Sequence, residues 1–216
     1  MSKNETTKAR ILDAAEQLFA ERGFAETSLR TITARAKVNL ASVNYHFGSK
    51  KSLIQDVFDR FLSDYTTGLI QRLAELEKEL AQDGKASEQA LDTETLLKAL
   101  VSPLLILERK RKASISIFMR LLGRAYAETQ GHLRRYVTEK YGFVLVRFTM
   151  LFQQAYPNLS NDQIFWRLHY TLGSLIFTLA GSDALREISA VDFKREMAIE
   201  DVIDEMIPFL AAGMKA

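Results

Sequence analysis

The chain has 216 residues, of which 47% are hydrophobic and 26% are charged, and it carries a formal net charge of +2. This composition fits one medium-sized domain or two smaller ones with a substantial core, and it argues against a disordered chain. The lack of cysteine excludes disulfides, thiol catalysis and thiolate metal sites. The polar start and the lack of an apolar span of ~20 residues predict a soluble, cytoplasmic protein with neither a signal peptide nor a membrane partner.

The small net charge conceals an uneven distribution. Residues 1–52 contain nine Lys or Arg and five Asp or Glu, which gives +4. The remaining residues contain 20 basic and 22 acidic side chains, which gives −2. Phosphate binding requires a positive segment of this kind, although a run of charge is more often simply a solvated face.

The first predicted helix runs from about Thr6 to Arg22. Its inner stripe consists of apolar residues at helical spacing, namely Ile11, Ala15, Leu18 and Phe19. Gly23 stands where a left-handed C-cap is needed, and Phe24 can fold back onto Phe19.

Two short helices joined by a tight turn are predicted within Thr27–Lys50. Thr27 or Ser28 can cap the first helix, whose buried stripe is Leu29, Ile32 and Ala36. Asn39 can cap the second helix, in which Val43 and Phe47 lie one turn apart and point inward. The other side chains of this helix face outward or sideways: Leu40, Ala41, Ser42, Asn44, Tyr45 and His46. A helix of this kind fits a DNA major groove, so the pattern predicts a helix-turn-helix. Ser49 can cap a further helix that starts at Lys50.

Residues Ala14–Leu53 resemble the N-terminal domain of TetR-family transcriptional regulators, with the elements G-F-x-x-T-S, Y-H-F and S-K in the family's order. The resemblance implies a double-stranded DNA operator as partner, with phosphate contacts from Thr27, Tyr45, His46 and Lys50. The full predicted DNA-binding set is Thr27, Ser28, Lys37, Leu40, Ala41, Ser42, Asn44, Tyr45, His46 and Lys50. Lys37 departs from the family, which usually has Gly there; a left-handed non-Gly residue costs ~1 kcal/mol. Either the turn tolerates this cost or Lys37 adds a phosphate contact.

The rest of the chain is predicted to be helical, giving an all-α fold of about nine helices in the TetR arrangement. The expected domains are a DNA-binding domain at 1–52 and a ligand-binding and dimerisation domain at 53–216. A long helix from Lys50 to about Leu80 precedes a polar loop at 81–92, and Pro103 kinks or ends the next helix. Later helices cover Ser114–Thr129, His132 to about Tyr156, Ser160 to about Ser182 with a capping box to Gln163, and Ile199–Ala212. No helix is assigned between the last two.

Two of the later helices carry small and apolar residues that favour a homodimer interface. The expected interface residues are Gly173, Phe177, Ala180, Gly181, Met206, Phe209 and Leu210. Glycine inside a helix costs ~1 kcal/mol and tends to occur where another helix approaches closely. TetR-family members pair their last two long helices in this way. The competing interpretation is packing within one chain.

The stretches Ser116–Tyr136 and Pro208–Met214 resemble the PsrA-type fatty-acid-responsive branch, which implies a long-chain fatty acid or acyl-CoA effector. The middle helices are expected to line its pocket. The predicted ligand-binding residues are Phe61, Tyr65, Leu100, Phe118, Arg120, Leu122, Tyr126, Phe143, Arg147 and Phe148. Arg147 lies among apolar residues and needs an anionic partner, because an unpaired buried charge is costly. That partner is the ligand's carboxylate or phosphate, or else an acid of this chain. Arg120 and Arg124 form a second candidate pair for an anionic head.

Enzyme functions find little support. The three histidines, His46, His132 and His169, fall on separate predicted helices without metal-ligand spacing, and no catalytic motif, cofactor site or metal site stands out. The predicted function is a repressor released from its operator by a hydrophobic effector. The alternatives are a TetR regulator that responds to drugs or other amphiphiles, and a helical lipid-binding or acyl-processing protein with a vestigial DNA domain.

Overall fold

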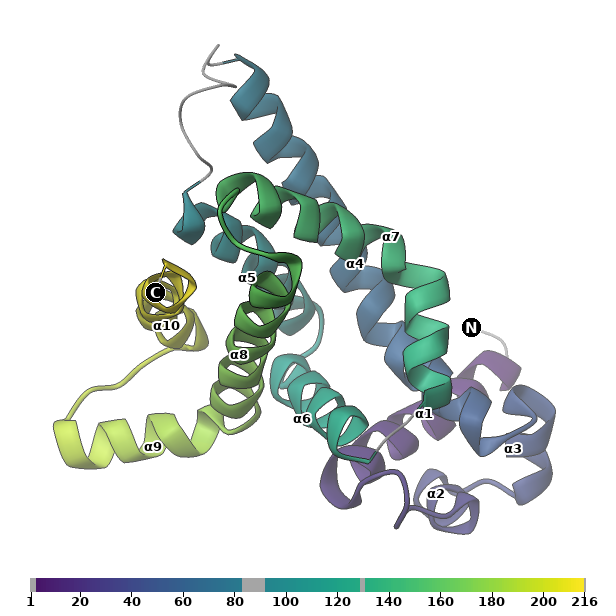
Figure 1. The fold of residues 1–216 in the computed structure, drawn as a ribbon. Helices are drawn as coiled ribbons and strands as arrows, with labels where there is room; N and C mark the ends of the chain where they lie inside the picture. Colours follow the sequence, from purple (N-terminus) through teal and green to yellow (C-terminus); the bar gives the residue numbers. More distant parts are fainter. Residues whose placement is uncertain (1–2, 83–91, 129–130, 216) are drawn as a thin grey trace. The chain divides into compact units, whose positions relative to one another are not determined.

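The computed structural model describes residues 3–82, 92–128 and 131–215, and these form ten α-helices without a strand. The all-α prediction is confirmed, with one helix more than expected (Figure 1). The helices are α1 (Lys3–Arg22), α2 (Leu29–Ala36), α3 (Leu40–Phe47), α4 (Lys50–Gln82), α5 (Thr93–Lys110), α6 (Ser114–Ala127), α7 (Gly131–Ala155), α8 (Asn161–Ala180), α9 (Ser182–Phe193) and α10 (Ile199–Lys215). None of these described helices is both long and apolar enough to span a bilayer.

Helix α9 was not expected from the sequence. Of the two alternatives for Pro103, the end of the helix is excluded, because α5 continues through it. A proline inside a helix costs ~3 kcal/mol. Helix α5 buries a long stripe that offsets this cost: Leu96, Leu97, Val101, Pro103, Leu104 and Leu107. Most of the predicted loop at 81–92 lies outside the described residues.

The chain divides into two compact units. The first unit comprises the described residues of Met1–Ser63 and Ile117–Lys140, and the second comprises those of Asp64–Ser116 and Tyr141–Ala216. Helices α4, α6 and α7 therefore contribute residues to both units. The predicted boundary after residue 52 differs from this division and stays a prediction.

The first unit closes around aromatic and aliphatic side chains. The predicted inner stripe of α1 is buried, with Ile11, Ala15, Leu18 and Phe19 at most 1% exposed. The rings of Phe19 and Phe24 lie 5.2 Å apart, as predicted from the Gly23 cap. Phe61 of α4 stacks on Phe118 of α6 at 5.1 Å. This core anchors the helices that carry the helix-turn-helix.

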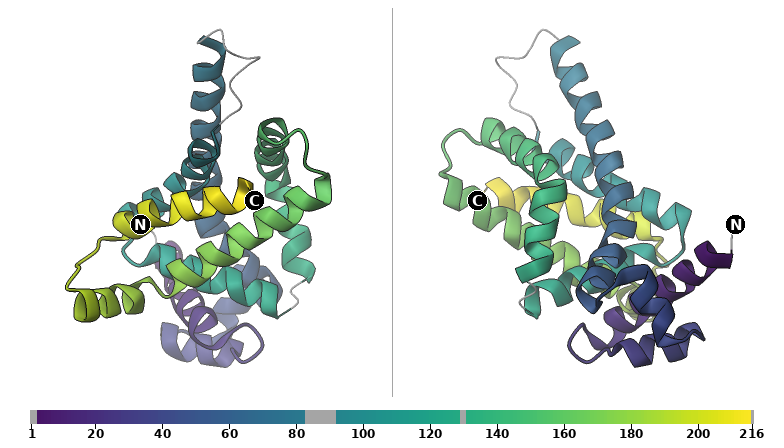
Figure 2. Two further views of the ribbon diagram at one scale, coloured as in Figure 1. Left: turned by 60° about the vertical axis from the view of Figure 1, so that its left-hand side comes forward. Right: turned by 90° about the vertical axis from the view of Figure 1, so that its right-hand side faces the viewer.

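In the second unit α10 packs against α5 and α8, and the packing buries one side of α10 (Figure 2). The predicted capping box opens α8: Ser160 Oγ accepts from the Gln163 N–H at 3.4 Å, and the Gln163 side chain accepts from the Ser160 N–H at 2.9 Å. Helix α9 follows α8 after Gly181 and contacts it.

Candidate nucleic-acid interface

Each short helix of the helix-turn-helix starts at a residue whose side chain caps it. Ser28 caps α2, because its hydroxyl accepts from the Thr31 N–H at 3.1 Å. Asn39 caps α3, because its Oδ1 accepts from the Ser42 N–H at 2.8 Å. Asn39 was predicted as a cap, and Ser28 was one of the two candidates for the other cap; such caps contribute ~1 kcal/mol each.

Thr27 corrects one predicted DNA contact. Its side chain is fully buried, and its hydroxyl donates to the carbonyl oxygens of Gly23 at 2.7 Å and Leu18 at 3.2 Å. The hydroxyl thus binds one carbonyl oxygen inside α1 and one just past its end, and this burial gives no support to a phosphate contact from Thr27. The role of Thr27 is to hold the connection between α1 and α2.

The turn between α2 and α3 contains a left-handed residue. Lys37 has φ 52° and ψ 49°, the conformation for which glycine is normally used. Arg10 of α1 donates to the carbonyl oxygens of Ala36 and, at 3.0 Å, of Lys37. A side chain of α1 therefore holds the strained turn in place.

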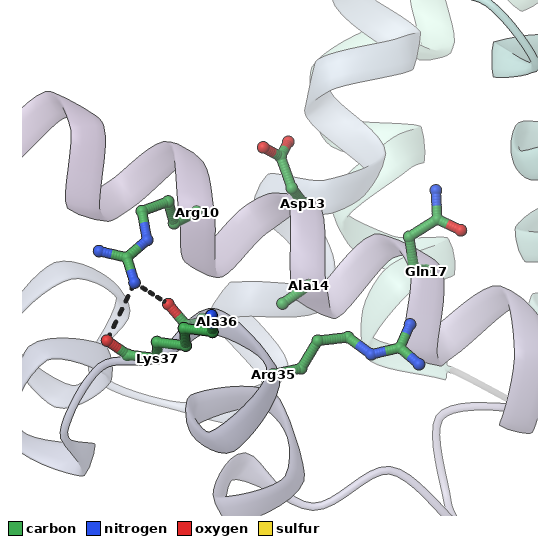
Figure 3. A pocket seen from close by; sticks show the side chains of 7 residues that line it. All are labelled: Arg10, Asp13, Ala14, Gln17, Arg35, Ala36 and Lys37. Carbon is green, nitrogen blue, oxygen red and sulfur yellow. Dashed lines mark hydrogen bonds between the residues drawn. The ribbon is translucent and has the colours of Figure 1, made fainter.

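A pocket of about 320 Å³ opens between α1 and the end of α2 (Figure 3). Its lining includes Arg10, Arg35 and Lys37, of which Arg10 binds the turn and Arg35 pairs with Glu21 at 3.2 Å. Asp13, also in the lining, pairs with Arg60 at 2.8 Å. These charges are engaged in holding α1, α2 and α4 together. No sequence pattern distinguishes Arg10 from an ordinary solvated arginine, so the prediction missed it.

Helix α3 is anchored by two side chains, as predicted, and its other side chains are exposed except Ser42 and His46, which are half-buried. Val43 is fully buried and Phe47 is 7% exposed. Ala41 and Asn44 are exposed, and Tyr45 and Leu40 are 75% and 40% exposed. Ser42 is half-buried and donates from its hydroxyl to Asn39 Oδ1 at 2.9 Å, so part of its bonding capacity belongs to the cap. The exposed residues have the size and polarity that suit base edges in a major groove.

The helix-turn-helix is also strongly basic. No Asp or Glu occurs between Glu26 and Asp56, whereas five basic residues do: Arg30, Arg35, Lys37, Lys50 and Lys51. Lys50 lies in the first turn of α4, with its ammonium 3.5 Å from the Ala25 carbonyl oxygen. Helix N-termini and basic side chains together attract phosphate.

Residues 11–57 match the family described as bacterial regulatory proteins, tetR family, and residues 98–213 match the tetracyclin repressor-like C-terminal domain. The chain belongs to the TetR family. A helix-turn-helix transcriptional repressor of Mycobacterium tuberculosis, Rv3405c, is 43% identical to this TetR-family chain over 90 residues, covering 40% of the chain and 47% of the repressor. The chain thus spans about half the length of the curated relatives it matches. KstR2 of Rhodococcus jostii, also named a transcriptional repressor, is 39% identical over 57 residues, covering 26% of the chain and 28% of KstR2. These relatives are named as regulators and not as enzymes.

Solved structures agree on the fold over nearly the whole chain. An alanine-substituted mutant of HlyIIR superposes with a TM-score of 0.61 at 18% identity, covering 99% of this chain and 97% of the mutant. A TetR-like regulator from Rhodococcus sp. RHA1 superposes with a TM-score of 0.56 at 20% identity, covering 95% and 93%. At these identities the likeness concerns the TetR fold alone.

The predicted ligand-binding residues fall into both units. In the first unit Phe61 and Phe118 are buried and Leu122 is half-buried, whereas Arg120 and Tyr126 are exposed. In the second unit Phe148 is buried, and the Tyr65 hydroxyl donates to the carbonyl oxygen of half-buried Leu100 at 3.0 Å. Burial raises the pKa of Tyr65, so its hydroxyl stays protonated. Phe143 is 64% exposed, which corrects the expectation that it points inward.

Arg147 has an acidic partner within its own unit. Its Nε donates to Glu77 Oε1 at 2.9 Å, and its Nη2 bonds the other carboxylate oxygen. These hydrogen bonds hold the pKa of Glu77 below its usual value and raise that of Arg147. Of the alternatives left open by the sequence, the structure shows the intramolecular pair. It gives no support to Arg147 as the site of an effector head group.

The predicted interface helices expose large apolar side chains. Phe177 of α8 and Phe209 of α10 are 74% and 73% exposed, and Gly173 is exposed. Ala180, Gly181 and Met206 are half-buried. Leu210 is 4% exposed, because it faces the core of its own unit. Two exposed aromatic side chains do not by themselves identify an interface, so the dimer contact stays a prediction.

Proposed function

We propose that this TetR-family protein is a transcriptional repressor that binds a palindromic DNA operator as a homodimer and is released by a hydrophobic effector. The observation that carries the proposal is the combination of an anchored, exposed α3 with the acid-free stretch between Glu26 and Asp56. The exposed face of α3 supplies base contacts, and the surrounding basic side chains supply phosphate contacts.

In this proposal each protomer inserts α3 into a major groove. A single unit of this size buries too little surface to be both tight and selective, so two protomers act together on half-sites about one helical turn apart. The exposed aromatic side chains Phe177 and Phe209 support pairing through α8 and α10. Gly173 allows close approach of a second helix.

The proposed effector is a long-chain fatty acid or acyl-CoA. This part of the proposal is supported by the resemblance of Ser116–Tyr136 and Pro208–Met214 to fatty-acid-responsive regulators. A long acyl tail contributes up to ~0.8 kcal/mol per buried methylene, which makes chain length the main determinant of affinity. By linkage, an effector that weakens operator binding binds less tightly to the DNA-bound dimer by the same factor.

The decisive experiment has two steps. First, the protein is used to select duplexes from random oligonucleotides, and binding to the selected duplex is measured at several salt concentrations. A palindromic consensus and a steep decrease of affinity with salt are expected; a helical lipid-binding protein with a vestigial DNA domain gives neither.

Second, small molecules extracted from the purified protein are identified by mass spectrometry, and release of the selected duplex is measured with fatty acids, their coenzyme A esters and matched alcohols. Release that depends on chain length and on the acidic head supports the effector class. Release by unrelated drugs alone would overturn that class while leaving the repressor proposal standing.

A further inference from the structure

A carboxylate directly after the end of α6, that of Glu128, binds the connection between α1 and α2. Glu128 Oε1 accepts from the Phe24 N–H at 3.1 Å, and Glu128 Oε2 accepts from the Ala25 N–H at 2.9 Å. Both donors lie more than 100 positions away along the sequence but within the same compact unit. Two adjacent backbone N–H groups that point at one carboxylate form an anion-binding nest.

Arg124, in the last turn of α6, completes this contact. Arg124 Nη2 donates to the carbonyl oxygen of Glu21 at 3.3 Å, in the last turn of α1. That carbonyl is one of the groups that a helix leaves without a partner at its C-terminus. Arg124 thus binds a backbone carbonyl oxygen at the end of α1, and Glu128 binds the two backbone N–H groups that follow this end.

Gly23 leaves the space that the carboxylate occupies. It has φ +88°, and a Cβ there would lie 2.2 Å from Glu128 Oε1. A side chain at position 23 would therefore be strained by the backbone conformation, and it would also displace the Glu128 carboxylate. The glycine predicted as a helix cap also makes room for a distant acid, which no local sequence pattern reveals.

The connection that Glu128 binds leads directly to the start of α2. Residues 23–28 lead from the end of α1 to the N-cap of α2, and Thr27 is fixed by its bonds to Gly23 and Leu18. Helix α2 in turn leads through the Lys37 turn into α3. A displacement of 1 Å at a recognition element is large compared with the tolerance of hydrogen bonds to base edges.

We propose that Glu128 is a positioning residue for DNA binding, which acts through the amides of Phe24 and Ala25 to hold the helix-turn-helix in its binding geometry. This inference rests on the proposed function of DNA binding. Glu128 itself contacts no nucleic acid in this mechanism. Because Glu128 directly follows the last residue of α6, Ala127, displacement of this end of α6 loosens the connection.

The direction in which DNA affinity changes distinguishes a positioning role of Glu128 from a simple effect of its charge. Removing an acid from a DNA-binding unit strengthens DNA binding on electrostatic grounds alone. Loss of the positioning contact weakens it instead. Glu139 of α7 is exposed and lies in the same unit, so Glu139→Gln is the matched control for the charge.

The experiment compares Glu128→Gln, Glu128→Asp and Glu139→Gln with the wild type. Hydrogen exchange at the amides of Phe24 and Ala25 is measured without DNA, and affinity is measured for the duplex that the wild type selects. Glu128→Gln is expected to exchange about tenfold faster at both amides and to bind several-fold more weakly, since a charge-assisted hydrogen bond supplies about a factor of ten or more. Glu128→Asp keeps the charge but lacks the reach, so it is expected to weaken binding as well. Glu139→Gln leaves exchange unchanged and binds equally or more tightly.

Three results would overturn the proposal: unchanged exchange in Glu128→Gln, DNA affinity equal to that of Glu139→Gln, or loss of the folded state in Glu128→Gln, which would make the residue a folding determinant. Failure of the wild type to bind any duplex would instead refute the proposed DNA binding. The exchange comparison still reports on the Glu128 contact in that case.

A double-mutant cycle with Gly23→Ala gives an independent check. Its backbone strain appears in both halves of the cycle and cancels, which leaves the clash with the Glu128 carboxylate. The effects of Gly23→Ala and Glu128→Ala on exchange are expected to be less than additive. Strict additivity would contradict the assigned contact.

Discussion

Arg10 donates a hydrogen bond to the backbone carbonyl oxygen of Lys37 at 3.0 Å, which ties α1 to the turn of the helix-turn-helix. Lys37 is held at φ 52° although it has a side chain. A left-handed conformation of this kind persists only where its surroundings fix it. The second bond of Arg10, to the Ala36 carbonyl oxygen, strengthens the same constraint.

Two substitutions of Lys37 distinguish the energetic cost of its left-handed backbone from the effect of its positive charge. Lys37→Gly is expected to raise the free energy of unfolding by ~1 kcal/mol, because glycine adopts the left-handed region without a steric penalty. Lys37→Ala removes the same charge but keeps the strain, so it gives no such gain. Urea unfolding measures the difference between the two variants. If Lys37 contacts phosphate, both variants lower the salt slope of DNA binding by about one unit; equal stability of the two would refute the strain assignment.

Local signals predicted the short-range features of this site, and long-range contacts account for what they missed. The Ser28 and Asn39 caps and the Gly23 C-cap depend on neighbouring residues, so the sequence was sufficient. Thr27 was placed wrongly because its burial depends on the packing of α1.

The same contrast between local signals and long-range contacts applies to the rest of the fold. Helix α9 was missed although Leu185, Ile188 and Val191 repeat every three residues. Its apolar side chains are more than a third exposed, and no side-chain cap marks its start, so its boundary signals are weak. The pairing of Arg147 with Glu77 joins residues 70 positions apart, and the sequence could only limit the choices.

Asn44 is predicted to read bases. It is exposed on α3 between the anchors Val43 and Phe47. Asn44→Ala is expected to change the preferred base at one position of each half-site, at a cost of ~1–3 kcal/mol on the wild-type duplex. Selection from random oligonucleotides with both proteins measures this. The same consensus from both would remove Asn44 from the predicted readers.

Lys50 is predicted to contact phosphate. Lys50→Ala is expected to weaken binding to all duplexes alike and to lower the salt slope by about one unit, because one counterion fewer is released. Titrations of the selected and a scrambled duplex at several salt concentrations measure both effects. Lys112→Ala, which removes an exposed lysine of the second unit, is the control. A slope that matches the control would exclude a phosphate contact by Lys50.

The exposed aromatic side chains of α8 and α10 are predicted to form the dimer interface. Phe177→Asp and Phe209→Asp each place an unpaired charge in that interface, so the dimer is expected to weaken by about 3 kcal/mol or more. Both side chains are exposed in the single chain, so its own folding changes little. Sedimentation measures the dissociation constant. Phe143→Asp alters another exposed phenylalanine, outside the predicted interface, and dissociation in that control alone would contradict the assignment.

The pair of Glu77 and Arg147 is predicted to contribute to stability in a pH-dependent way. The hydrogen bond from Arg147 lowers the pKa of Glu77 in the folded state. A lowered carboxyl pKa adds stability above the unfolded value, and this contribution is lost as the pH falls through the folded value. The side chains are 36% and 42% exposed, so solvent screening limits the coupling to at most ~1 kcal/mol.

A double-mutant cycle of Glu77→Gln and Arg147→Met tests this contribution by urea unfolding near pH 7 and at about pH 3, below the usual range of a glutamate pKa. Coupling is expected near neutrality and is expected to decrease in acid; coupling that grows as the pH falls would contradict the pairing. The same variants also test the effector site. Arg147→Met is expected to keep any discrimination between fatty acids and matched alcohols, because Glu77 already satisfies the guanidinium. Loss of that discrimination in Arg147→Met, but not in Glu77→Gln, would show that Arg147 binds the effector head group.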